Sequence, residues 1–134
     1  MSRPLVGKKA RDLMEREFIT IEGTVTVADA VRLMDERNKG GCIVKDAIGD
    51  TVGIFTERDV LRRVVAKRRD PVRTVVAEVM TADVVFAQAQ DDAWELLCLM
   101  VQENFRHLPV VDGRQAVGVI SLKGMCRALT AMEF

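Results

Sequence analysis

An internal repeat constrains the fold of this 134-residue chain more than any other feature of the sequence. Met14 and Met80 lie 66 positions apart in similar segments, as do Met34 and Met100, and Gly53 and Gly118 lie 65 positions apart. One copy is too short to bury its apolar residues well, so two copies are expected to pack as a pseudo-symmetric pair. We predict repeats at residues 5–70 and 71–134.

Each repeat is predicted to contain a strand, a helix, two strands and a closing helix, which is an α+β arrangement. A helical turn is expected before the first strand of each repeat, near Met14 and near Met80. Capping residues predict helices that begin at Thr26, Thr56, Asp92 and Ser121. The helix after Thr26 is expected to run to about Asn38 and to be stopped by Gly40 and Gly41. Strands are expected at 18–21, 42–44, 51–55, 84–87, 108–111 and 116–120.

The junction between the strand at 51–55 and the helix after it carries the most informative local pattern. Its sequence is Gly-Ile-Phe-Thr-Glu-Arg-Asp over residues 53–59. Thr56 and Asp59 fit a capping box, in which both residues serve only to start the helix. The same junction could hold an anion on free backbone N–H groups, while the Asp59 carboxylate accepts hydrogen bonds from the two hydroxyls of a ribose. The local pattern alone favours the capping role.

Composition and motifs exclude several classes of function. Basic and acidic residues number 20 each, and this zero formal charge argues against a general nucleic-acid binder. No apolar run could span a bilayer and residues 1–9 do not resemble a signal peptide, so a cytoplasmic location is expected. The sequence shows no Walker A loop, nucleophile elbow or coherent catalytic set, so we expect no enzyme activity. Cys42, Cys98 and Cys126 are expected to be reduced and mostly buried, and with His107 they lack the spacing of metal ligands.

The repeat, together with two motifs, closely resembles a pair of CBS domains, a family named for cystathionine β-synthase. The motifs are the run at 53–59 and Arg-His-Leu-Pro-Val-Val-Asp at 106–112, and the resemblance extends from about Leu5 to Leu129. CBS pairs commonly bind adenine nucleotides in clefts between their two repeats. The resemblance therefore implies a regulatory or energy-sensing module that binds AMP, ADP or ATP. CBS pairs also often dimerise, so a homodimer is expected.

The resemblance also implies a role for each residue that matches the family pattern. Asp59 would bind the ribose hydroxyls, Thr56 would face the phosphate, and Ile54 would flank the adenine. Arg106 and His107 would meet the phosphate charge, a role that suits the planar guanidinium of arginine. The other implied nucleotide-binding residues are Lys9, Met14, Asn38, Lys39, Gly40 and Lys123.

The second repeat departs from the family pattern. Gly118 and Ser121 match the glycine and the hydroxyl, but Gly124 stands where the carboxylate belongs. A ribose site there would lack its acceptor, so we expect one good nucleotide site in this chain. The departure also bears on the capping question, because Ser121 can cap a helix without an acid three residues later.

Three alternatives stay open at this point. The ligand could be another adenosyl compound, such as S-adenosylmethionine or NAD(H). The chain could also be a structural or interaction module that binds no nucleotide. A cluster of basic residues could bind RNA or an acidic partner, although such a cluster is usually a solvated helix surface; it comprises Arg62, Arg63, Lys67, Arg68 and Arg69. The effector protein and the regulated process are unknown.

Overall fold

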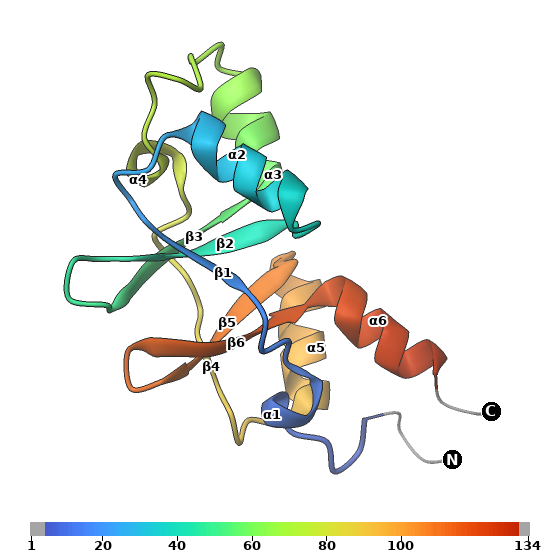
Figure 1. The fold of residues 1–134 in the computed structure, drawn as a ribbon. Coiled ribbons are helices and arrows are strands. Elements are labelled where there is room, and N and C mark those ends of the chain that lie inside the picture. The colour runs from blue at the N-terminus through green and yellow to red at the C-terminus, as the bar shows by residue number, and fades with distance from the viewer. Residues whose placement is uncertain (1–4, 132–134) are drawn as a thin grey trace. The chain divides into compact units, whose positions relative to one another are not determined.

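The computed structural model of the protein describes residues 5–131, and its backbone clusters into two compact units (Figure 1). The central unit is Phe18–Val84. The terminal unit combines the described parts of residues 1–17 and 85–134. Each unit contains a three-stranded sheet with helices, which confirms the predicted α+β class.

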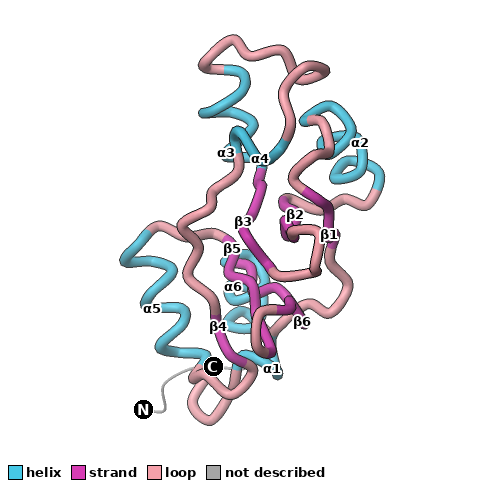
Figure 2. Tube along the Cα trace, turned by 90° about the vertical axis from the view of Figure 1, so that its left-hand side faces the viewer, coloured by secondary structure: helices cyan, strands magenta, loops and turns pink. Residues whose placement is uncertain are grey.

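In the central unit the sheet has the order β1-β2-β3, from β1 (Ile19–Glu22), β2 (Gly41–Lys45) and β3 (Thr51–Thr56). β1 is parallel to β2, which is antiparallel to β3. α2 (Val27–Glu36) and the helix that starts with α3 (Glu57–Asp59) lie on one face of this sheet (Figure 1). That helix continues as the π-helix η1 (Val60–Val65), and α4 (Val76–Val79) packs near it. Residues 66–74, between η1 and α4, form an irregular segment (Figure 2).

The terminal unit repeats this plan with the sheet order β4-β5-β6. Its strands are β4 (Ala87–Gln88), β5 (His107–Asp112) and β6 (Gln115–Ser121), and its helices are α1 (Ala10–Leu13), α5 (Ala93–Glu103) and α6 (Leu122–Thr130). Again the first pair of strands is parallel and the second is antiparallel. β4 is shorter and begins later than the strand predicted at 84–87. The two units therefore have the same topology, as the sequence repeat predicts.

Local capping explains where the longer helices begin and end. The side chains of Thr26, Asp92 and Ser121 each accept a hydrogen bond from the backbone N–H three residues later, as a helix N-cap does. α2 is followed by Asn38, whose φ of 53° is left-handed, and Asn104 ends α5 with a φ of 58°. Asparagine tolerates this conformation, so the expected stop at Gly40 and Gly41 comes earlier, at Asn38.

The opening segments of the two sequence repeats are exchanged between the units. α1 packs with α5, α6 and β6 in the terminal unit, where the N–H of Ala10 donates to the carbonyl of Asp91 at 2.8 Å. In the central unit α4 contacts η1, and the N–H of Val76 donates to the carbonyl of Val25 at 2.8 Å. Each unit thus takes its opening helix from the other repeat of the sequence.

No helix within residues 5–131 has both the length and the apolar character needed to cross a membrane.

Candidate functional site

The junction between β3 and α3 brings together three of the predicted site residues in the central unit, namely Gly40, Thr56 and Asp59. Thr56 is the last residue of β3 and pairs with Gly41 at the start of β2. The N–H of Glu57, the first residue of α3, donates to the carbonyl of Gly40 at 3.0 Å. Gly40, Thr56 and the start of the helix that carries Asp59 are therefore neighbours. The π-helical turns that follow are a form often found at functional sites.

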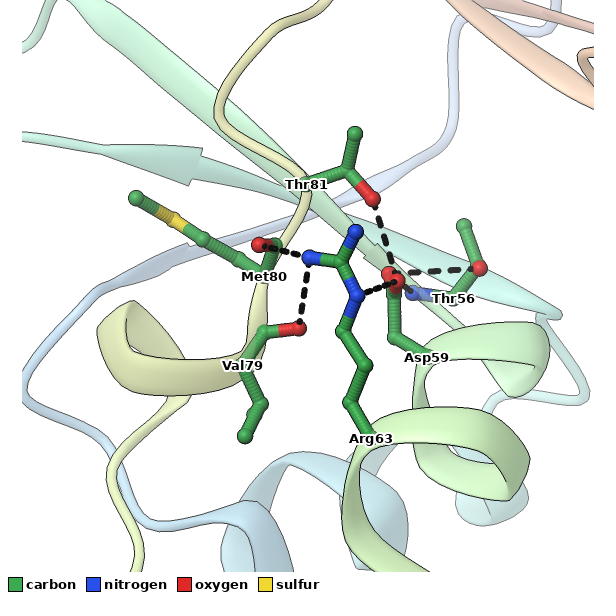
Figure 3. Close-up of polar contacts among 6 residues, drawn as sticks. All are labelled: Thr56, Asp59, Arg63, Val79, Met80 and Thr81. Atoms are coloured by element: carbon green, nitrogen blue, oxygen red, sulfur yellow. Dashed lines mark hydrogen bonds and ion pairs between the residues drawn. The ribbon is translucent and has the colours of Figure 1, made fainter. Parts of the chain in front are cut away.

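The carboxylate of Asp59 is held from two sides (Figure 3). Its Oδ2 accepts from the N–H of Thr56 at 3.0 Å and from the Thr56 hydroxyl at 3.4 Å. Its Oδ1 accepts from the hydroxyl of Thr81 at 3.0 Å. Asp59 is only 6% exposed, so these bonds replace hydration that the carboxylate loses on folding. The bond from the Thr56 N–H is the contact that a capping box predicts.

Arg63 completes the surroundings of the carboxylate. Its Nε lies 3.7 Å from Oδ1 of Asp59, in an ion pair one turn along the helix. Its Nη1 donates to the carbonyl of Met80 at 2.7 Å and to that of Val79 at 3.4 Å. Arg63 therefore connects the helix that carries Asp59 to the segment that carries Thr81 (Figure 3).

The other residues predicted for this side of the site also lie in the central unit. Ile54 is 6% exposed in β3, and its N–H and carbonyl both pair with the backbone of Thr81 at 2.9 Å. Asn38 and Lys39 precede β2, where Asn38 follows α2 in the left-handed conformation described above. These residues lead into the same end of the sheet as Gly40.

The remaining predicted residues lie in the terminal unit. The carbonyl of Arg106 accepts from the N–H of Leu122 at 2.8 Å, and His107 pairs with Ser121 across β5 and β6. Lys123 lies in the first turn of α6, so these three basic residues gather at the start of β5 and α6. Met14 packs against Gly118, and the N–H of Lys9 donates to Asp12 at the start of α1. The predicted set is thus divided between the units, with six residues in the central unit and five in the terminal unit.

The terminal unit has a different arrangement at the position equivalent to Asp59. Ser121 caps α6 alone, accepting from the N–H of Gly124 at 2.9 Å. A Cβ placed on Gly124 would lie 4.0 Å from Oε1 of Glu15. A carboxylate is therefore present near this position, but it comes from the opening segment rather than from the helix.

Sequence reasoning missed the roles of Thr81 and Arg63. Arg63 follows Asp59 by four residues on a predicted helix, and that spacing is a recognisable signal for an ion pair. Thr81 lies 22 residues from Asp59, and no local pattern connects them. Only the exchange of opening segments brings Thr81 to this carboxylate.

The cysteines and the basic cluster have limited roles in the described structure. Cys42 is buried, and this burial raises the pKa of its thiol to about 11, with the charge of Arg37 opposing the shift. Cys98 and Cys126 are exposed, so the expectation that the cysteines are mostly buried is wrong. Their helices bury other positions, such as Leu97 and Met125. Within residues 5–131 no group of three potential ligands could hold a metal ion.

Two arginines of the basic cluster are engaged inside the central unit. Arg63 pairs with Asp59, as described above, and Arg69 forms an ion pair with Glu78 at 2.7 Å. These contacts reduce the positive charge that the cluster presents for RNA or for an acidic partner.

Comparison with known proteins agrees with this fold. The family model of the CBS domain matches the chain twice, over residues 10–66 and 76–131. The chain belongs to the CBS-domain family. The CBS domain-containing protein CBSCBSPB3 of Arabidopsis thaliana is 37% identical over 94% of this chain, and the chain spans 23% of that relative's length.

Solved structures of CBS-domain proteins share the fold. A CBS-domain protein from Burkholderia ambifaria is 36% identical with a TM-score of 0.81, covering 89% of this chain and 88% of that one. The CBS domain pair of protein MJ0100, solved with 5′-methylthioadenosine and S-adenosyl-L-methionine, is 22% identical. Its TM-score of 0.85, over 94% of this chain and 98% of that one, shows the common fold.

Proposed function

We propose that this CBS pair is a regulatory module that binds an adenine nucleotide, AMP, ADP or ATP, and signals to a separate protein. In this proposal Asp59 accepts the two ribose hydroxyls and Thr56 faces the phosphate. The buried carboxylate of Asp59, the last residue of α3, is the observation that carries the proposal. The module regulates and does not catalyse.

A comparison between the two units supports a binding role for Asp59. Starting the closing helix does not require an acid, because α6 begins with Ser121 as its cap and Gly124 three residues later. In the central unit the acidic side chain of Asp59 takes the equivalent position, although burying a carboxylate costs free energy that neighbouring donors must offset. Helix initiation alone does not require an acid there. Thr81 and Arg63 bind this acid within the protein, and a ligand with hydroxyl donors can bind it as well.

For the other residues of the nucleotide site, the proposal keeps the roles that the family resemblance implies. Arg106, His107 and Lys123 meet the phosphate charge in this proposal, and Lys9, Met14, Asn38, Lys39, Gly40 and Ile54 complete the nucleotide site. The protein acts as a homodimer in the cytoplasm. Nucleotide binding changes its output only to the extent that the ligand binds one arrangement of the module more tightly than another.

Thermal unfolding with added nucleotides tests the proposal. AMP, ADP or ATP should raise the melting temperature, because a ligand at 100 times its Kd stabilises the folded state by about 2.7 kcal/mol. GTP, which has the triphosphate of ATP and a different base, is the control ligand. Asp59→Asn keeps an acceptor for the helix cap but removes the charge, so it should weaken nucleotide binding about tenfold or more at a small cost in stability. Arg106→Ala should weaken ATP binding more than adenosine binding.

A matched variant separates binding from helix capping. Asp92 caps α5 in the terminal unit by accepting from the N–H of Glu95 at 3.0 Å, and it has no proposed ligand role. Asp92→Asn should therefore leave nucleotide affinity unchanged. If no nucleotide shifts the melting temperature, and Asp59→Asn only destabilises the protein, the module binds no nucleotide and Asp59 serves the fold.

S-adenosylmethionine is the second candidate ligand, because the structural relative MJ0100 was solved with this compound and with 5′-methylthioadenosine. Both compounds contain the same ribose diol, so they would use Asp59 in the same way. Including S-adenosylmethionine and NAD(H) in the thermal series ranks these ligands against AMP, ADP and ATP.

A further inference from the structure

The Asp59 carboxylate has an orientation that its neighbours determine. The N–H of Thr56 occupies one acceptor position on Oδ2, and the hydroxyl of Thr81 occupies one on Oδ1, each at 3.0 Å. The Thr56 hydroxyl at 3.4 Å and the Arg63 Nε at 3.7 Å are longer contacts. A carboxylate has about four lone-pair positions, so a ligand hydroxyl can take the place of the longer contact on each oxygen.

We propose that Thr81 is a positioning residue that fixes the Asp59 carboxylate for two-point binding of a ribose diol. With one oxygen held by the Thr56 N–H and the other by the Thr81 hydroxyl, the plane of the carboxylate is fixed, and the positions of the two longer contacts are the ones that the ligand hydroxyls take in this proposal. Thr81 thereby determines the preference for ribonucleotides over 2′-deoxyribonucleotides, which offer only one hydroxyl. This inference rests on the proposed nucleotide function of Asp59.

The backbone holds Thr81 firmly enough for this role. Its N–H and its carbonyl both pair with Ile54 of β3 at 2.9 Å. The two residues before it, Val79 and Met80, accept hydrogen bonds from Arg63. Gly53 lies so close to the Thr81 carbonyl that a Cβ there would be 2.9 Å from it. These contacts fix the backbone of Thr81, from which its hydroxyl reaches Oδ1 of Asp59.

The terminal unit shows that this backbone arrangement does not need the polar side chains. There Glu15 and Val119 form the same two backbone hydrogen bonds, at 2.8 and 2.9 Å, and Met14 packs on Gly118 as Met80 does on Gly53. The positions equivalent to Thr81, Asp59 and Arg63 are occupied by Glu15, Gly124 and Ala128. None of the three positions keeps its side chain in the terminal unit, where the carboxylate near Gly124 belongs to Glu15 of the opening segment. This difference is expected if Thr81, Asp59 and Arg63 act together in ligand binding, and the fold does not require it.

The test is the affinity ratio between AMP and 2′-deoxy-AMP, measured by calorimetry on the full chain. These ligands share base and phosphate and differ in one hydroxyl. Wild-type protein should prefer AMP, and Thr81→Val, which has nearly the same shape without the hydroxyl, should reduce that preference about tenfold, as for the loss of a hydrogen bond to a charged group. Thr81→Ser should restore it. Thr74→Val is the control, because it removes a buried hydroxyl of the central unit that does not contact Asp59 and is bonded to the carbonyl of Asp70 at 2.7 Å.

The outcomes distinguish a failure of this inference from a failure of the proposed function. If Thr81→Val weakens both ligands equally, or if it tightens AMP binding, Thr81 does not position the carboxylate and the inference fails while the proposed function stands. If wild-type protein binds neither ligand, the proposed function fails and the inference fails with it. If circular dichroism shows that Thr81→Val is unfolded, Arg63→Met decides. This substitution removes the hydrogen bonds from Arg63 to the carbonyls of Val79 and Met80, which precede Thr81. It should therefore also reduce the preference for AMP over 2′-deoxy-AMP.

Discussion

The substitution Gly53→Ala should destabilise the protein through a single close approach in the central unit. A Cβ on Gly53 would lie 2.7 Å from Sδ of Met80 and 2.9 Å from the carbonyl oxygen of Thr81. The Met80 side chain can rotate away, but the Thr81 carbonyl is held by the N–H of Ile54 at 2.9 Å. Either β3 must therefore move away from the segment that carries Thr81, or the hydrogen bond between Ile54 and Thr81 must lengthen.

The expected loss of stability is estimated from two costs. Inserting one carbon into a packed region costs about 1–3 kcal/mol, and weakening one backbone hydrogen bond costs about 1 kcal/mol. We expect the free energy of unfolding to fall by about 2 kcal/mol, which lowers the urea midpoint by about 1 M. Urea titrations followed by far-UV circular dichroism measure this change, with an unchanged m-value as the sign that compactness is retained.

Gly118→Ala is the matched control in the terminal unit. The three atoms nearest to a Cβ there all belong to the Met14 side chain, at 2.5, 2.8 and 3.0 Å. Because rotation about side-chain bonds moves most of those atoms, the loss should be less than half of that for Gly53→Ala. The reasoning is refuted if Gly53→Ala is as stable as wild type, or if Gly118→Ala is the more damaging substitution.

Three further predictions concern individual side chains. Asp59→Ala removes the acceptor for the Thr56 N–H and the Thr81 hydroxyl, so chemical denaturation should show a loss of about 2–3 kcal/mol, larger than for Asp59→Asn; equal losses would contradict the capping contacts. Ser121→Ala should cost about 1 kcal/mol in the same assay, because α6 loses its N-cap. The thiol pKa of Cys42 is raised from 9.0 to about 11, so folding holds this proton more tightly. Its contribution to stability is full below pH 9 and is lost between pH 9 and 11 at about 1 kcal/mol per pH unit, and Cys42→Val should lack this part of the pH dependence.

The sequence predicted the repeated plan of the fold because its signals are local. Capping residues such as Thr26 and Ser121 start helices through bonds to residues three positions away, and the apolar runs of β2 and β5 form strands as expected. Helix ends were less certain because asparagine and glycine can both adopt the left-handed conformation. Asn38 ends its helix before the glycines are reached.

The exchange of opening segments could not be predicted in the same way. Periodicity shows that Met14 and Met80 occupy equivalent positions, but it does not show on which copy each segment packs. The same limit applies to the candidate site. Thr56 and Asp59 were found because they share one short motif, whereas Thr81 reaches Asp59 only through long-range pairing with Ile54.

The exchanged segments also give the two units different folding requirements. The central unit is one continuous stretch, so all of its contacts are available once residue 84 has left the ribosome. The terminal unit must bring residues 5–17 to the segment that follows residue 84, across the whole of residues 18–84. Closing so long a loop costs conformational entropy, and contacts between distant residues form slowly. The central unit should therefore assemble during translation, and α1 should find its place only after synthesis of α6.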